Sequence, residues 1–426
     1  MIKTLKLPIL FAVLFAAVLI FIIGHYYFFS SSSAAEWYIK IAKGDIKDAV
    51  QPFASRVLHP MIVRVVSFFS GLDISLSFYV VNVFLLLSFV FILSLFFSEI
   101  SFMNPPLVFV VLFTPFLLDF HRNFYMSDVL FGFLAALFFF SLKRKNIILS
   151  LSLLFILFFS RPADAMVLGV ILLVVSFYKK EMKLAKASLV VILFAYLLIS
   201  LVITPLGAPN IHNISNLTYR SLQPIYYFVR SVLGIDWMMS TQVQYCQPKF
   251  LIYPPSWIHL GGIKWIGVCG FNIVNPLSVI FYSLITFGLI PGMLFSTLRK
   301  NWRQFFTKNE VWLLVAMGYG ILVFFLGILV PNLRTVSYGW PAFWLAGFYI
   351  LDRQIRQWPV EAKKSLIKLF TIVQAVLLWV PYLIVKNLPN TPETLKYFLA
   401  LFVVAFLYLI FIRRYSITAK KYNIVL

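Results

Sequence analysis

Apolar segments long enough to enter a membrane follow one another along almost the whole chain. They number about twelve, near residues 7–29, 74–98, 105–118, 128–142, 146–160, 164–178, 187–206, 275–297, 311–330, 337–351, 365–385 and 395–412. Of the 426 residues, 62% are hydrophobic and 12% are charged, and a soluble fold could not bury so much apolar surface. The sequence therefore predicts an all-α, polytopic membrane protein with about twelve transmembrane helices.

Membrane topology explains most of the net charge of +22. If the N-terminus lies inside and the segments alternate, the short inner loops collect basic clusters such as Lys143–Lys145 and Arg413–Arg414. This bias follows the positive-inside rule and predicts cytoplasmic N- and C-termini. We expect an integral protein of a bacterial inner membrane, with the endoplasmic reticulum as the alternative. Membrane lipids are expected partners, whereas no basic stripe with interleaved aromatics indicates nucleic acid.

The same alternation places two large segments outside, residues 30–73 and 207–274. They divide the chain into an N-terminal transmembrane module (1–206), a large outer loop (207–274) and a C-terminal transmembrane module (275–426). Apolar residues at helical spacing in 30–73 predict two short amphipathic helices in the membrane interface. Cys246 and Cys269 both lie in the second segment, where an oxidising compartment would permit a disulfide, with two free thiols as the alternative.

Glu36 is the first candidate for chemistry, because it lies just outside the first apolar segment. A carboxylate there is well placed to act as a base on a substrate at the membrane surface. Two structural roles compete with this interpretation. Glu36 also completes a capping-box pattern with Ser33, and it lies one helical turn before Lys40, with which it can pair.

A second polar cluster runs from Asp119 to Asp128, between two apolar runs. Asp128 lies at the edge of the hydrocarbon, where an ionisable group is costly unless it is paired or faces water, so it is a candidate for function. The alternative is a helix N-cap. The further candidates on the outer face are Asp119, His59, His121 and Tyr125.

Arginines are frequent on the outer side. Guanidinium groups form bidentate hydrogen bonds with phosphate oxygens, so an anionic phosphate has four candidate ligands, Arg56, Arg122, Arg161 and Arg334. Arg161 can instead pair with Asp164 and stabilise a tight turn. No cofactor is required, although the outer carboxylates leave Mg²⁺ or Mn²⁺ open.

Three stretches resemble the GT-C superfamily of integral-membrane glycosyltransferases, of the type that depends on polyprenyl-phosphate sugars. They run from Glu36 to Gly44, from Gln51 to Pro60 and from Asn123 to Asp128, and the resemblance covers residues 1–180. Glu36 matches the acid of the first outer loop, Arg56 the loop arginine and Asp128 the acid of the second outer loop. The first-loop acid of that family is more often Asp than Glu, which leaves open whether Glu36 or Asp128 is the base.

The resemblance implies an inverting hexosyl- or pentosyltransferase of the cell envelope. Its donor would be a polyprenyl-phosphate-linked sugar, and its acceptor a hydroxyl of a glycan, lipid or protein on the periplasmic or lumenal face. Three other classes remain as alternatives. An O-antigen polymerase or ligase would use residues 207–274 and no carboxylate base, a transporter or flippase of lipid-linked saccharides would carry charges within its spans, and an assembly subunit would have no activity.

Overall fold

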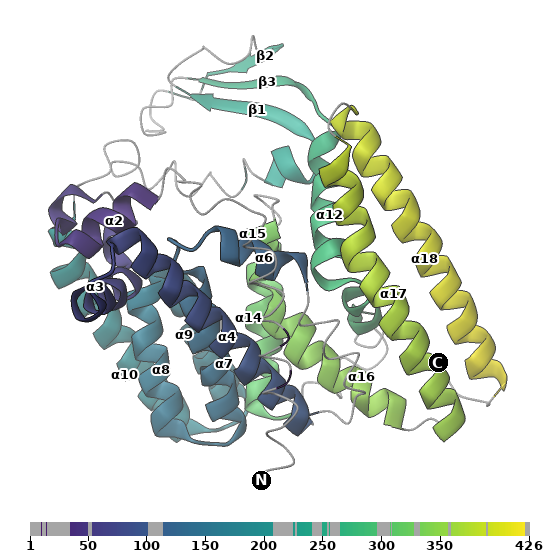
Figure 1. The fold of residues 1–426 in the computed structure, drawn as a ribbon, viewed down its shortest axis with the longest axis horizontal. Coiled ribbons are helices and arrows are strands. Elements are labelled where there is room, and N and C mark those ends of the chain that lie inside the picture. The colour runs from purple at the N-terminus through teal and green to yellow at the C-terminus, as the bar shows by residue number, and fades with distance from the viewer. Residues whose placement is uncertain are drawn as a thin grey trace.

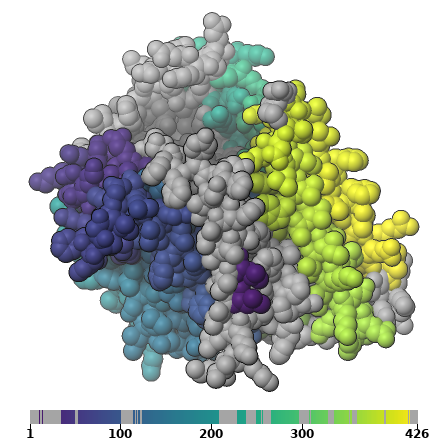
Figure 2. All heavy atoms as spheres, in the orientation of Figure 1, coloured from purple at the N-terminus to yellow at the C-terminus, as the bar shows by residue number. Residues whose placement is uncertain are grey.

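The computed structural model describes residues 35–49, 53–100, 114–207, 228–240, 249–253, 265–295, 309–327, 333–356, 359–388 and 391–421, with a few isolated positions. These residues are mostly helical. The predominantly helical fold class is thereby confirmed in its coarse form. The helices pack side by side into two groups, an N-terminal group on the left of Figure 2 and a C-terminal group on its right.

The N-terminal group occupies the left side of Figure 1. It contains α2 (Ala35–Lys43), α3 (Leu58–Ser70), α4 (Ile74–Ile100), α6 (Pro115–Arg122), α7 (Asp128–Lys143), α8 (Ile147–Ser160), α9 (Pro162–Tyr178) and α10 (Met182–Leu198). Short turns η1 (Ile46–Asp48) and η2 (Phe53–Ser55) join α2 to α3, and η3 (Ile199–Ile203) and η4 (Thr204–Leu206) extend α10. The two helices predicted for the first outer segment correspond to α2 and α3.

The C-terminal group contains α12 (Val274–Phe287), α17 (Val360–Asn387) and α18 (Glu393–Lys421), which pack against one another. Between the two groups lie α14 (Val311–Gly327), α15 (Leu333–Ser337), the π-helical segment η5 (Pro341–Ala346) and α16 (Gly347–Arg356). One hydrophobic core runs through both groups, and it includes aromatic contacts such as Phe89 against Trp340, with ring centroids 5.3 Å apart.

A small antiparallel sheet, which the sequence did not predict, crosses one end of the helices. Its strands β1 (Ile235–Ser240), β2 (Phe250–Ile252) and β3 (Trp265–Phe271) pair in the order β1-β3-β2. Apolar runs this short do not distinguish a strand from part of a helix by periodicity. Cys269 lies on β3 and is disulfide-bonded, whereas Cys246 lies outside the described residues.

Four described helical segments are long and apolar enough to cross a membrane, which supports a membrane protein. They are Ile74–Glu99, Met182–Leu206, Val360–Asn387 and Glu393–Tyr415. The twelve predicted spans are not confirmed. Five of the predicted spans correspond to helices of only 14 to 17 residues, α7, α8, α9, α12 and α14, shorter than the roughly 20 residues of a perpendicular span. Nearly all of segment 7–29 lies outside the described residues.

The segments predicted to lie outside gather at one end of the helices. In Figure 1 the sheet lies at the top, α2, α6 and α15 lie below it at the upper ends of the N-terminal helices, and the hairpin between α7 and α8 lies at the lower end. That hairpin carries Lys143, Arg144 and Lys145, and Lys143 pairs with Glu99 of α4 at 2.7 Å. The arrangement is compatible with the predicted alternation, and the assignment of the upper end to the outer side stays a prediction.

Helix α12 ends within the apolar core, where a second helix satisfies its backbone. Gly288 has a φ of 59° and a ψ of −125°, a conformation that favours glycine. The side-chain amide of Gln374 on α17 donates to the carbonyl of Phe287 at 3.0 Å and accepts from the N–H of Leu289 at 2.8 Å. Tyr408 of α18 donates to the carbonyl of Gly288 at 2.9 Å. The break is therefore tolerated because neighbouring helices replace the missing hydrogen bonds.

We expect Gln374→Leu to destabilise the protein by about 1 to 3 kcal/mol for each of the two backbone groups that lose their partner. The measurement is the free energy of unfolding in detergent. Thr371→Val is the matched control, because among the described residues the Thr371 hydroxyl bonds to the Ile367 carbonyl of its own helix and to no other helix. Equal effects of the two substitutions would show that the clamp across α12 contributes nothing.

Candidate functional site

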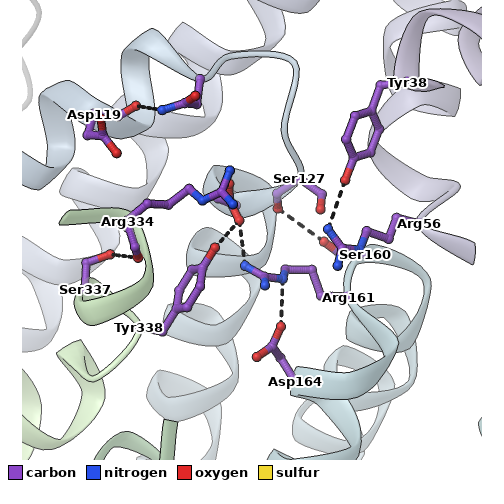
Figure 3. Close-up of polar contacts among 12 residues, drawn as sticks. Tyr38, Arg56, Asp119, Ser127, Ser160, Arg161, Asp164, Arg334, Ser337 and Tyr338 are labelled. Carbon is purple, nitrogen blue, oxygen red and sulfur yellow. Dashed lines mark hydrogen bonds and ion pairs between the residues drawn. The ribbon is translucent and has the colours of Figure 1, made fainter. Parts of the chain in front are cut away.

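The buried carboxylate of Asp128 is the centre of a charged network, and its partners Arg161, Arg334 and Tyr338 are labelled in Figure 3. Asp128 begins α7, and its side chain is only 6% exposed. Nη1 of Arg161 donates to its Oδ1 at 2.6 Å, and the hydroxyl of Tyr338 donates to the same oxygen. Nε of Arg334 lies 3.8 Å from Oδ2. Three segments that are far apart in the sequence therefore meet at one carboxylate.

Arg161 is enclosed by its partners. It lies between α8 and α9, where Pro162 opens the next helix and Arg161 itself takes an extended conformation. Its Nε lies 2.7 Å from Oδ2 of Asp164, and its guanidinium lies 4.2 Å from the centroid of the Tyr338 ring. The predicted pairing of Arg161 with Asp164 is thus present, and Asp128 is a second carboxylate on the same cation.

Arg56 and Arg334 have looser contacts than Arg161. Arg56 donates to the hydroxyl of Tyr38 at 3.3 Å and lies 5.6 Å from the Phe53 ring centroid, so both of these partners are neutral. Arg334 is 30% exposed, and both Asp128 and Asp119 attract it electrostatically. Because a guanidinium has five N–H donors, both arginines retain hydrogen-bonding capacity for an anion that enters the site.

Glu36 lies apart from this network. Its side chain is 64% exposed and pairs with Lys40 at 2.9 Å, one turn along α2. The structural role foreseen for Glu36 as a partner of Lys40 is therefore present, and among the contacts of the described residues none joins Glu36 to Asp128. Glu36 and Asp128, the two acids predicted to share one catalytic role, thus occupy different surroundings.

His59 is fully buried in α3. Its ring meets Phe78 edge-on, with centroids 5.3 Å apart, and neither ring nitrogen has a well-aligned hydrogen-bond partner among the described residues. Burial lowers the pKa of His59 from 6.5 to about 4, although the charge of Asp128 and the backbone of Tyr125 partly oppose the shift. His59 is therefore neutral at pH 7.

The remaining predicted residues take varied positions. Tyr125 is buried, with its ring 5.2 Å from Phe78, and it contributes to packing. Asp119 is half-buried on α6, and the side chains of His121 and Arg122 on that helix lie outside the described part. Within the described ranges, no group of three or more His, Cys, Asp or Glu side chains is arranged to hold a metal ion.

The sequence interpretation missed two tyrosines of the network, Tyr38 and Tyr338. Tyr38 lies in the first of the two predicted amphipathic helices, where a tyrosine fits packing as well as binding. Tyr338 follows Arg334 by four residues, a spacing that puts two side chains on one face of a helix, so a signal for their proximity was present. Both phenols are found beside arginines: Tyr38 accepts a hydrogen bond from Arg56, and Tyr338 stacks against Arg161.

We expect Arg161→Gln to destabilise the protein by about 3 to 5 kcal/mol, because it leaves the carboxylate of Asp128 buried without its closest cation. Arg334→Gln should cost much less, since Arg334 is more exposed and lies farther from Asp128. The check is the free energy of unfolding of both variants in the same detergent. A larger loss for Arg334→Gln would contradict the ranking of the two ion pairs.

His59 should make the folded state sensitive to acid. Because its pKa is lower in the folded state than in the unfolded chain, the unfolded chain binds more protons between pH 6.5 and 4, and stability falls as the pH drops through this range. We expect His59 to remove about 2 kcal/mol of stability between pH 7 and pH 5. His59→Leu should lose less over the same range, whereas equal losses in unfolding experiments would refute this origin.

Searches against known proteins add no further identification. No family model, no curated protein and no solved structure matches the chain. The interpretation of the Asp128 network therefore rests on the residues and contacts described above.

Proposed function

We propose that the protein is a membrane glycosyltransferase that moves a sugar from a polyprenyl-phosphate-linked donor to an acceptor hydroxyl. The observation that carries this proposal is the cluster of three arginines at one end of the helices: Arg161 and Arg334 approach the buried Asp128, and Arg56 acts on it electrostatically. Such a cluster suits a phosphate that must stay close to the membrane.

The three arginines would have different tasks in this reaction. Arg161 is occupied on two sides by carboxylates, so its task is to hold Asp128 and the turn between α8 and α9 in place. Arg56 and Arg334 would bind the donor phosphate with their remaining N–H groups. As the bond from the sugar to the phosphate breaks, negative charge builds up on the phosphate, and fixed cations stabilise that charge most strongly in the transition state.

An apolar groove beside α7 supports a lipid-linked substrate. The groove has a volume of about 380 Å³ and is lined by Phe84, Leu87, Ser88, Phe91, Ile92 and Phe133. Phe133 follows Asp128 by five residues on α7, a rise of about 7.5 Å along the helix axis. Because Phe133 also lies about 140° around the α7 axis from Asp128, we propose that the hydrocarbon tail of the donor runs from the arginines around α7 to this groove, which α4 mainly forms.

Two carboxylates remain candidates for the base that accepts the proton of the acceptor hydroxyl. Oδ2 of Asp128 is buried and has no hydrogen-bond donor among the described residues, so it can accept a proton from a hydroxyl that reaches it. Glu36 is exposed at the first outer loop, where an acceptor would arrive. The proposal places the reaction on the outer face of a bacterial inner membrane, in the synthesis of cell-envelope polysaccharide.

The test begins with native mass spectrometry of the protein purified in mild detergent. We expect a bound polyprenyl phosphate or its sugar adduct, with about tenfold weaker binding in Arg56→Ala. Arg230→Ala is the matched control, since Arg230 is a half-exposed outer arginine that faces Asp236 instead of Asp128. Finding only ordinary phospholipids, even after polyprenyl phosphate is added, would contradict the proposal.

The sugar mass then defines a transfer assay. Replacing the true base, by Glu36→Gln or Asp128→Asn, should lower the transfer rate by about 10²- to 10⁴-fold. The other substitution should have a smaller effect on the rate at saturating donor. Full activity in both variants would rule out a carboxylate base at these two positions. It would favour an enzyme of the O-antigen polymerase or ligase type.

A further inference from the structure

We propose that Asp128 and the phosphate group of the substrate compete for Arg334. When the phosphate binds Arg334, the carboxylate of Asp128 is released to accept the proton of the acceptor hydroxyl. The inference rests on the proposed function, because it assumes that a phosphate ester enters this site and that Asp128, of the two candidate carboxylates, is the base. It assigns to Arg334 the role of a positioning residue, which holds Asp128 before the substrate binds and holds the phosphate afterwards.

The first support is the difference between the two arginines on Asp128. Arg161 is 12% exposed, lies 2.6 Å from Asp128 and 2.7 Å from Asp164, and stacks on Tyr338. Arg334 is 30% exposed and lies 3.8 Å from Asp128. A cation with close partners on several sides cannot turn to a new anion without leaving them unpaired. Arg334 has fewer and more distant partners than Arg161, so turning it to a new anion breaks fewer contacts. It is therefore the arginine that can move.

The second support is the difference between the two oxygens of Asp128. Oδ1 receives hydrogen bonds from Arg161 and Tyr338, which fix the orientation of the carboxylate. Oδ2 is buried and has no hydrogen-bond donor among the described residues, although Arg334 lies nearby. A buried carboxylate oxygen without a donor is costly. Once Arg334 turns away, the negative charge near Oδ2 loses a nearby cation, so accepting a proton at Oδ2 becomes more favourable.

This arrangement orders the reaction. Before the phosphate binds, Arg334 stabilises the charge on Oδ2 and disfavours proton transfer to it. After Arg334 has turned to the phosphate, the proton of the acceptor hydroxyl can pass to Oδ2 while the acceptor oxygen bonds to the anomeric carbon. The bond from that carbon to the phosphate oxygen breaks, and its electron pair stays on the leaving polyprenyl phosphate. The donor therefore binds before the acceptor is activated.

The test measures the binding of two probes, undecaprenyl phosphate and inorganic phosphate, to the purified protein in detergent. If Asp128 competes for Arg334, Asp128→Asn should bind each probe about three- to tenfold more tightly than the wild type. The asparagine keeps the shape of the side chain and can still accept the hydrogen bond from Tyr338. Both probes are used because the competition concerns the phosphate group, while only the lipid probe can also occupy the apolar groove.

Asp164→Asn is the matched control. It removes the same charge beside Arg161, but no contact between Asp164 and Arg334 is found among the described residues. A gain in Asp128→Asn that exceeds the gain in Asp164→Asn, and that disappears when Arg334→Gln is added, is the expected result. Unchanged or weaker binding in Asp128→Asn, or equal gains in the two variants, would overturn the inference. Wild-type protein that binds neither probe would overturn the proposed function itself.

A second measurement needs no variant and covers the case in which Asp128→Asn does not fold. The wild type is labelled with ¹³C at its aspartate carboxyl groups, and its infrared spectrum is recorded before and after undecaprenyl phosphate is added. Release of Arg334 should shift an aspartate band away from the position of an ion-paired carboxylate. Saturated binding without any change in the aspartate bands would overturn the competition.

Discussion

The arrangement of the upper end depends on one constraint, the cost of keeping the charge of Asp128 out of water. An isolated buried carboxylate would cost several kcal/mol, so it must be met by cations and hydrogen-bond donors from other segments. Arg161 joins the turn between α8 and α9 to the start of α7, and Tyr338 and Arg334 bring the segment around α15 to the same place. The carboxylate thus connects the N-terminal helices to the C-terminal part of the chain.

The end of α12 follows the same principle, that a buried polar group needs a partner, but here the groups are uncharged. Within an apolar interior, the backbone groups around Gly288 need partners as much as a carboxylate does. Gln374 and Tyr408 supply them from α17 and α18. The neutral clamp holds three helices together and uses both the oxygen and the nitrogen of the Gln374 amide for backbone groups, whereas the charged network leaves Arg56 and Arg334 with unused N–H groups. That difference marks the charged network as the candidate for binding.

The sequence indicated which residues are candidates more reliably than which of them lie together. Arg56, Asp128, Arg161 and Arg334 were recognisable because charged residues are rare in this chain and interrupt its apolar runs. Glu36 was recognised in the same way, but its place in the first loop could not tell whether it faces Asp128 or Lys40, and the structure pairs it with Lys40. Tyr38 and Tyr338 escaped notice because a tyrosine beside an apolar run fits packing equally well.

The sequence by itself determined the helical, membrane-type character of this protein, since long apolar segments can satisfy their backbone only as helices in an apolar medium. It also predicted that basic loops and the other polar segments lie on opposite sides of the membrane. Only the tertiary structure decided that Arg161 and Arg334 meet at one carboxylate and that a three-stranded sheet lies beside α12. The hydrogen bond from Tyr338 to the same carboxylate joins residues 210 positions apart, and local sequence patterns carry no information about which distant segments pack together.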